Sequence, residues 1–371
     1  MISEKAYMSS KRVFILGAGF SKMAGMPLAT DLTNHLGGKF REDNLEDALE
    51  WLGCLQQRIE WLGDGKSKGI NIKEVFDLAQ FDIELLKMRQ QLCQLGRNCG
   101  DTRWQDADGI EAWLEYMEHD LRDVVWEKQK KATLDAVKRF SNYLNPNDIV
   151  LTFNYDTLLE KSLEQQNKKW HYGFEQEKGS GVKILKMHGS INWIMVRRDQ
   201  KDNFDYPLLF EKTDLNVEYH GAKASNEIEY NYVLLRVPND KLPNRIENRD
   251  LQLGNKQYEI AMAGLGKYKL LSELVGSGEI WNNAIRALRN CEQIYIIGFS
   301  LSPFDTMARL HFGGVMMERS KEKKIRLPLI TLIDPIAGEL KSNFKKVFGC
   351  SASIDVIEKK GEEVDWSTLL A

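Results

Sequence analysis

Two polar side chains, those of Asn154 and Asp156, follow directly after the apolar run Ile149–Thr152. At the end of a strand, an amide and a carboxylate two residues apart can both project into a crevice. The amide would face sugar hydroxyls, and the carboxylate would face an amide or a developing cation. Asn and Asp also cap helices at strand-to-helix turns. The segment therefore indicates either a binding crevice or the start of a helix.

A histidine follows a second apolar run, in the segment Lys186-Met187-His188-Gly189-Ser190. Neutral imidazole, with an unperturbed pKa of about 6.5, is well suited to accept a proton from a sugar hydroxyl near neutral pH. Gly189 would let a substrate or another backbone segment come close. The sequence predicts a general base at His188.

A glycine-containing turn, Gly17-Ala18-Gly19 with Ser21, ends the apolar run at 11–16. Glycines after a first strand let backbone N–H groups and a helix N-terminus approach a pyrophosphate. The spacing differs from the usual dinucleotide fingerprint, since the next glycine is Gly25. The two interpretations are phosphate binding at Gly17, Ala18, Gly19 and Ser21, and a plain strand-to-helix turn.

A similar turn at Gly298 and Ser300 follows the run Gln293–Ile297. A glycine and a small hydroxyl at a strand end suit contact with a ribose or a phosphate. Asp334 closes the run Leu329–Ile333, which we expect to be the last strand, and its carboxylate can accept hydrogen bonds from ribose hydroxyls.

These segments all lie where short apolar runs end, which is typical of strands covered by helices on both faces. The prediction is an α/β fold with a Rossmann-like, doubly wound parallel sheet. Between residues 40 and 139, apolar residues recur at helical spacing without proline, which predicts an inserted helical subdomain with a looser connection near Gly96 to Asp108. The polar stretch 192–231 predicts a long excursion or a small subdomain. The expected strands lie at 11–16, 148–153, 182–187, 232–237, 293–297 and 329–333.

Composition narrows the class of protein further. The 371 residues are 43% hydrophobic and 28% charged, as in soluble globular proteins. The net charge is only −3, so the overall charge gives no reason to expect a polyanionic partner. No apolar run reaches the roughly 18 residues of a membrane helix and no signal peptide is evident, which favours the cytoplasm. The cysteines are scattered, so we expect structural thiols and no metal site: Cys54, Cys93, Cys99, Cys291 and Cys350.

The order of these segments resembles the sirtuin family, with its Gly-Ala-Gly-x-Ser loop, Asn-x-Asp strand end, His-Gly turn and Gly-x-Ser turn. The resemblance implies an NAD-binding domain formed by residues 1–39 and 140–371. It implies that Asn154 and Asp156 contact the nicotinamide ribose and carboxamide, and that His188 is the base. The remaining matches would hold the rest of NAD, with the phosphates at Gly17, Ala18, Gly19 and Ser21 and the adenosine side at Gly298, Ser300 and Asp334.

Two features of sirtuin deacylases are missing from this sequence. Their zinc module has two closely spaced cysteine pairs, which are absent here, and Gly25-Met26-Pro27 is not followed by their arginine-bearing segment. The variants Asn-Tyr-Asp, His-Gly-Ser-Ile-Asn-Trp and Gly-Phe-Ser-Leu look more like the sirtuin-like NAD hydrolases of bacterial antiphage systems. That resemblance implies NAD as substrate, no zinc, a homo-oligomer, and a protein partner such as a HerA-type ATPase that supplies the trigger.

The expected activity is therefore hydrolysis of the nicotinamide–ribose bond, with nucleic acid involved only indirectly and no membrane. A non-catalytic module that senses NAD or ADP-ribose and controls an assembly is the alternative, since it would need the same glycines and Asp334. It would have little need for Asn154 together with His188. A nuclease is disfavoured because the sequence offers no cluster of metal-binding carboxylates.

Overall fold

The computed structural model describes residues 12–62, 72–94, 107–174, 180–197, 217–220, 231–236, 258–262, 277–302, 305–321 and 326–370. The predicted connection from Gly96 lies almost wholly outside these residues, as do Cys99 and most of the excursion at 192–231.

A seven-stranded parallel sheet forms the centre of one compact unit, in the order β11-β10-β9-β1-β2-β4-β3. Strand β1 lies in the middle, with Val13 opposite Ile149 of β2 on one side and Ile294 of β9 on the other. The α/β, Rossmann-like prediction is confirmed. The strands are β1 Arg12–Leu16, β2 Ile149–Thr152, β3 Trp170–His171, β4 Val182–Lys186, β9 Gln293–Ile297, β10 Leu329–Ile333 and β11 Ile354–Ile357.

Two expectations about the strands were wrong. The run at 232–237 does not join the parallel sheet, because Asn231–Arg236 forms β7 in a separate antiparallel sheet. Leu329–Ile333 is not the last strand, because β11 pairs with its outer edge. In β11, Asp355 and Val356 are exposed, so this edge strand lacks the continuous apolar run that identifies a strand buried on both faces.

The antiparallel sheet has the order β6-β7-β5-β8. Its first strand, β5, starts at Gly189, so only Met187 and His188 separate it from β4 of the parallel sheet. The predicted base therefore lies where the chain passes from one sheet to the other. The strands are β5 Gly189–Arg197, β6 Val217–His220, β7 Asn231–Arg236 and β8 Tyr258–Met262.

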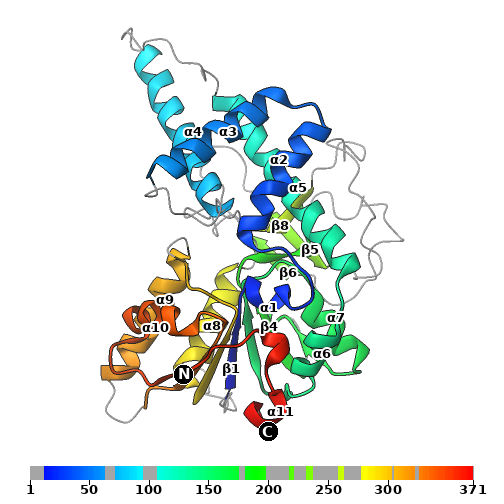
Figure 1. Cartoon of the computed structure of the whole chain (residues 1–371), viewed down its shortest axis with the longest axis vertical. Coiled ribbons are helices and arrows are strands. Elements are labelled where there is room, and N and C mark those ends of the chain that lie inside the picture. Colours follow the sequence, from blue (N-terminus) through cyan, green and yellow to red (C-terminus); the bar gives the residue numbers. More distant parts are fainter. Residues whose placement is uncertain are drawn as a thin grey trace. The chain divides into compact units, whose positions relative to one another are not determined.

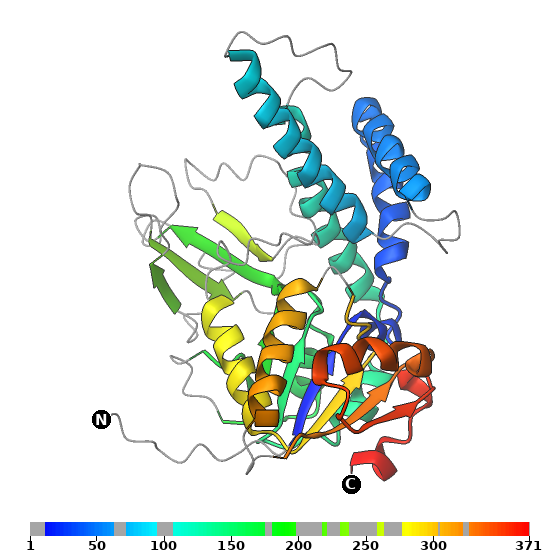
Figure 2. The same cartoon turned by 90° about the vertical axis from the view of Figure 1, so that its left-hand side faces the viewer.

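Helices cover both faces of the parallel sheet. In Figure 1 and Figure 2, α8 (Ser277–Asn290), α9 (Thr306–Lys321) and α10 (Ala337–Phe348) lie together on one side. The other side carries α6 (Asp135–Ser141), α7 (Leu158–Gln165) and α11 (Trp366–Leu370).

The core forms where these layers meet the fully buried face of β1. The Phe14 ring stacks on Tyr295 at 5.1 Å and meets the edge of Phe140 at 5.5 Å. These contacts pack β1, and hence the start of the turn that follows it, against β9 and α6 on one face of the sheet.

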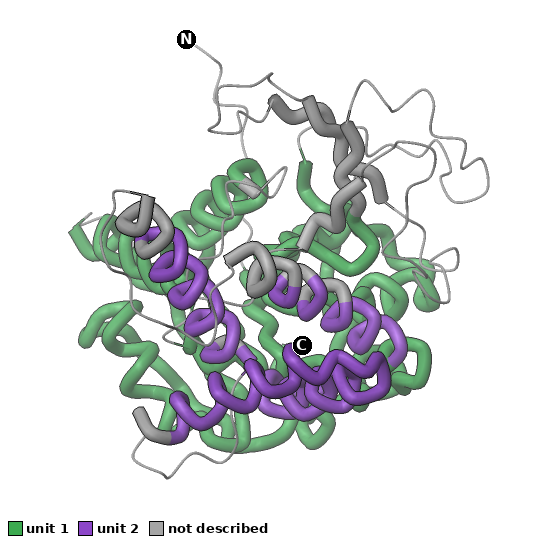
Figure 3. The backbone as a smooth tube through the Cα atoms, turned by 90° about the horizontal axis from the view of Figure 1, so that it is seen from above, with its two compact units in different colours: residues 1–26, 128–263, 270–371 green, residues 27–127, 264–269 purple. Residues whose placement is uncertain are grey.

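Most of the helical segment between β1 and β2 belongs to a second compact unit, residues 27–127 with 264–269, shown in purple in Figure 3. The sequence had placed the helical insertion at 40–139. Within this unit, Trp51 packs on Trp113 at 5.4 Å and Phe40 on Tyr116 at 5.5 Å. In the described part of the chain, no helix combines the length and apolarity that a membrane span requires. The main helices are α2 Ala29–Glu42, α3 Glu46–Leu62, α4 Ile72–Gln94 and α5 Ala107–Lys131.

Candidate functional site

The glycine turns after β1 and β9 pack directly on each other. The Gly17 N–H donates to the Ile297 carbonyl at 3.1 Å, and the Gly19 N–H donates to the Gly298 carbonyl at 2.9 Å. A Cβ atom on Gly17 would lie 2.5 Å from the Gly298 oxygen, and one on Gly19 would lie 2.7 Å from the Gly298 Cα. The close packing of the two backbone segments therefore explains why glycines occupy these positions, because it leaves no space for a side chain.

This packing lies where the strand order of the sheet reverses, since β2 and β9 extend the sheet on opposite sides of β1. In open α/β sheets, ligands bind outside the carboxyl ends of the strands at such a point. Ala18 is exposed at the start of the short helix α1 (Ala18–Lys22), and Ser300 is exposed after β9. These two predicted contacts face solvent, whereas Gly17 and Gly19 already donate to β9 and its turn.

Gly298 adopts φ +59°, a left-handed conformation that disfavours side chains. Its N–H donates to the Ile333 carbonyl at 3.0 Å, which ties the end of β9 to the end of β10. Asp334 follows Ile333 and is half-buried, and its Oδ1 accepts the Ile336 N–H at 3.0 Å. Burial raises the pKa of the Asp334 carboxyl above its ordinary value, and the hydrogen bond from Ile336 opposes that rise.

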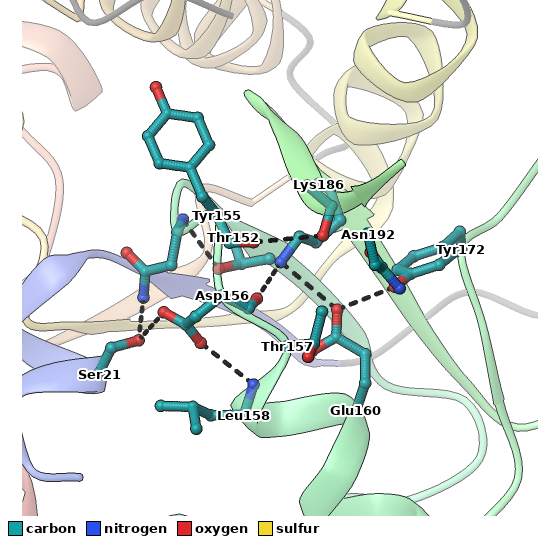
Figure 4. A network of polar contacts seen from close by, with 12 residues as sticks. Ser21, Thr152, Tyr155, Asp156, Thr157, Leu158, Glu160, Tyr172, Lys186 and Asn192 are labelled. Atoms are coloured by element: carbon teal, nitrogen blue, oxygen red, sulfur yellow. Dashed lines mark hydrogen bonds and ion pairs between the residues drawn. The ribbon is translucent and has the colours of Figure 1, made fainter. Parts of the chain in front are cut away.

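Three predicted site residues, Ser21, Asn154 and Asp156, form one buried chain of hydrogen bonds. The Asn154 Nδ2 group donates to the Gly17 carbonyl and to Ser21 Oγ, each at 2.8 Å. Ser21 Oγ then donates to Asp156 Oδ2 at 2.6 Å, as Figure 4 shows. These bonds use both amide hydrogens of Asn154 and orient its Oδ1 away from Gly17. Ser21 links the β1 turn to the β2 turn, and its contact with the phosphates stays a prediction.

Asp156 also initiates helix α7. Its Oδ1 accepts the Leu158 N–H at 3.2 Å, so the carboxylate binds Ser21 with one oxygen and the helix start with the other. The neighbouring Thr157 N–H donates to Gln129 Oε1 at 2.6 Å. The capping interpretation thus describes what Asp156 does in this structure, and its contact with the nicotinamide carboxamide remains a prediction.

His188 is only 4% exposed and lies against aromatic rings. Its imidazole meets Phe153 edge-on at 5.0 Å and is tilted against Tyr155 at 6.2 Å. Phe153 in turn stacks on Phe299 at 4.3 Å, which links the ends of β2, β4 and β9. Gly189 adopts φ +77°, so a glycine is required immediately after the histidine.

Backbone bonds hold the His188 segment beside the Asn154 segment. The Met187 N–H donates to the Thr152 carbonyl at 2.9 Å, and the Ile191 N–H donates to the Tyr155 carbonyl at 3.0 Å. Residues on both sides of His188 are therefore bonded to residues on both sides of Asn154. The structure brings together the two backbone segments that carry the side chains singled out by the sequence for chemistry.

Sequence reasoning missed a buried ion pair behind this site. Lys186 Nζ lies 3.4 Å from Glu160 Oε1, and both side chains are 1% exposed. Lys186 Nζ also donates to the main-chain carbonyl of Asp156. A strand ending in lysine directly before the His-Gly turn was the available signal, because lysine is almost never fully buried without a partner.

The described residues show no arrangement of metal ligands, and the buried thiol of Cys291 is unsuited to act as a nucleophile. No group of His, Cys, Asp and Glu there is arranged to hold a metal ion. Cys291 is buried, and burial raises the pKa of its thiol to about 11, which keeps the thiol protonated at neutral pH.

The comparison with protein families matches one part of the chain. A family model described as a SIR2-like domain matches residues 148–222. This segment contains Asn154, Asp156 and His188, and it does not reach the turns at Gly17 or Gly298. A search of curated proteins found no match. The match supports a sirtuin-like domain and, in general terms, an NAD-related activity.

Proposed function

We propose that this chain cleaves NAD⁺ at the nicotinamide–ribose bond, giving ADP-ribose and nicotinamide. The observation that carries the proposal is that backbone bonds hold the segment of His188 beside the segment of Asn154, at the carboxyl ends of β2 and β4. A purely structural turn needs neither an oriented amide nor an imidazole. Both belong to the segment that matches the SIR2-like model.

The chemistry requires little from the protein beyond positioning and charge stabilisation. The bond from the ribose C1′ to nicotinamide breaks, and its electron pair leaves with a nicotinamide that becomes neutral. The sugar passes through an oxocarbenium-like state, which a water molecule then captures at C1′. The water loses one proton, so a base and no strong acid is needed.

In this proposal, Asn154 orients the ribose or the attacking water through Oδ1, because its Nδ2 hydrogens are held by Gly17 and Ser21. His188 accepts the proton, directly or through a ribose hydroxyl, a role that contributes about 10²–10⁴-fold to rate. Ser21 connects the Asp156 carboxylate to this amide, and the carboxylate favours positive charge on the sugar. Ala18, Ser300 and Asp334 are proposed contacts for the phosphates and the adenosine ribose.

A non-catalytic NAD sensor remains the second candidate, and one observation favours it. Both oxygens of Asp156 are used within the fold, by Ser21 and by Leu158, so this carboxylate has a sufficient structural role without any reaction. A sensor would bind NAD or ADP-ribose and would show no turnover under any activating condition.

The biological setting is also proposed from the resemblance. We propose that the chain is an NAD-depleting effector of an antiphage system, acting as a homo-oligomer with a protein partner such as a HerA-type ATPase. The partner would supply the trigger and any contact with nucleic acid.

The test is to incubate the pure protein with NAD⁺, alone and with the product of a neighbouring gene, and to separate the products chromatographically. His188→Ala and Asn154→Ala should each lower kcat by at least about 100-fold while retaining much of the NAD affinity. Because both act on one step, the double variant should be hardly slower than either single one.

His35→Ala, on the partly exposed surface of α2, is the matched control and should cleave NAD⁺ like the wild type. Full cleavage by both His188→Ala and Asn154→Ala would refute the mechanism. Absence of turnover in the wild type, with NAD binding intact, would favour the sensor.

A further inference from the structure

The buried pair formed by Lys186 and Glu160 lies behind the candidate site and is not part of the proposed chemistry. Lys186 is the last residue of β4, and Glu160 lies in the first turn of α7. With both side chains 1% exposed, neither is positioned to touch a substrate. The pair therefore acts through the residues that it contacts.

Lys186 is hydrogen-bonded to the backbone of the Asn154–Asp156 segment. Its Nζ donates to the main-chain carbonyl of Asp156, and the Glu160 carboxylate holds the ammonium group from the other side. Glu160 is itself fixed by the Tyr172 hydroxyl at 3.2 Å, and this hydroxyl meets Asn192 of β5 at 3.4 Å. Figure 4 shows this network reaching from β5 to the turn after β2.

The contacts continue from Asp156 to Asn154. The Asp156 carboxylate accepts from Ser21 Oγ, and Ser21 Oγ accepts from the Asn154 amide. On the other side, Lys186 is separated from His188 by Met187 alone. One buried ammonium group thus connects the segment of the proposed base to the segment of the proposed ribose ligand.

Stability alone is a poor explanation for this pair. Replacing a buried ion pair by apolar residues of similar volume is often neutral or stabilising, whereas removing one partner is strongly destabilising. A function specific to this location would therefore be seen in the double apolar replacement. The chain offers a comparison in Arg12 and Asp148, a nearly buried pair at the opposite ends of the strands.

We propose that Lys186, held by Glu160, is a positioning residue that sets the placement of Asn154 and Asp156 relative to His188. Its loss should slow the chemical step by misplacing these groups, because small displacements of catalytic groups cost large factors in rate. For its kinetic consequence, the inference rests on the proposed NAD cleavage.

The experiment compares Lys186→Met, the double variant Lys186→Met with Glu160→Met, and Arg12→Met. Lys186→Met should lower the melting temperature because it leaves the Glu160 carboxylate buried without its cation. The double variant should recover most of the melting temperature, while its kcat stays roughly 10- to 100-fold low and its KM for NAD changes little. Arg12→Met should lower the melting temperature and leave kcat unchanged.

A conservative variant, Glu160→Gln, keeps an oxygen acceptor for Lys186 and should retain kcat within about threefold, measured below its own melting temperature. If folded Glu160→Gln loses as much kcat as Lys186→Met, the carboxylate charge matters by itself and positioning through Lys186 is wrong. A double variant with wild-type kcat would overturn the inference equally.

Hydrogen–deuterium exchange of the peptide around 153–158 gives a readout that needs no turnover. In this segment the Asn154, Thr157 and Leu158 N–H groups donate to side chains. The double variant should exchange faster there and not near 143–148, whereas Arg12→Met should show the reverse. Wild-type exchange at 153–158 in the double variant refutes positioning, even if the wild type proves unable to cleave NAD⁺.

Discussion

The two ends of the parallel sheet are held together by different means. At the amino ends of the strands, Arg12 makes a bidentate ion pair with Asp148, at 3.0 and 2.7 Å, and donates to the carbonyls of Tyr143 and Leu370. At the carboxyl ends, glycine backbones pack on each other, and a chain of small polar side chains connects Ser21, Asn154 and Asp156.

The amino ends of the strands are held by structural contacts, whereas the carboxyl ends carry the candidate functional site. The arginine joins β1 to α11 and to the turn before β2, and each of these contacts is explained by the fold. At the carboxyl ends, Gly17, Gly19 and Gly298 have no side chains, and the buried polar groups there need hydrogen-bond partners. Natural proteins accept such costs mainly at functional sites.

The largest effect should come from breaking the glycine packing. Gly298→Ala would place a Cβ 2.3 Å from the Phe20 nitrogen at a residue with φ +59°, so both sterics and backbone strain oppose it. We expect a loss of about 3 kcal/mol or more in the free energy of unfolding, measured by urea denaturation.

The matched control is Gly314→Ala in α9, where an added Cβ meets nothing within 4 Å. Alanine is the better helix former, so this variant should gain about 0.5–1 kcal/mol. Similar unfolding curves for the two variants would show that the turns have more room than their contacts indicate.

A somewhat smaller effect is expected at the opposite end of the sheet. Arg12→Met leaves Asp148, whose side chain is 5% exposed, without its cation, and should cost about 3 kcal/mol or less. NAD cleavage per folded molecule should be unchanged, because the pair lies at the far ends of β1 and β2. A reduced kcat in this variant would show that the amino ends of the strands also influence catalysis.

The smallest effect should arise at Asp334. Because burial raises the pKa of its carboxyl in the folded state above the ordinary 3.8, the folded protein binds this proton more tightly than the unfolded chain. The carboxylate therefore costs stability above about that pH. Asp334→Asn keeps an acceptor for Ile336 and should slightly raise the melting temperature at neutral pH, with the gain shrinking toward pH 4.

The same variant sharpens the binding proposal. An amide oxygen accepts a ribose hydroxyl less strongly than a carboxylate, so NAD affinity, measured by calorimetry, should fall as the melting temperature rises. An affinity equal to that of the wild type would remove Asp334 from the proposed adenosine site.

Local patterns were sufficient for most of the fold. Apolar runs ending in Gly17, Asn154, His188 and Gly298 predicted the parallel strands, and the helical spacing between β1 and β2 predicted the inserted helices. The run at 232–237 was assigned to the wrong sheet, because a short apolar run does not reveal its pairing partner.

The interior of the site was beyond a reading of single segments. Glu160 and Lys186 occur in ordinary helix and strand settings, and their pairing depends on α7 and β4 being brought together. Ser21 was matched to phosphate binding by its turn, whereas its partner Asp156 is distant in sequence. Side-chain partners separated by long stretches of chain leave no local pattern.

The central position of β1 has a consequence for how the protein folds. It is synthesised before the other strands of the sheet, but its partner strands lie around residues 149 and 294. Val13 can therefore pair with Ile149, and later with Ile294, only after those residues have been synthesised. Pairings so distant in sequence fold slowly and expose apolar strands in the meantime. On the ribosome, Val13-Phe14-Ile15-Leu16 therefore remains an unpaired hydrophobic segment throughout synthesis of the helical unit, and chaperone binding at this stage should favour correct folding.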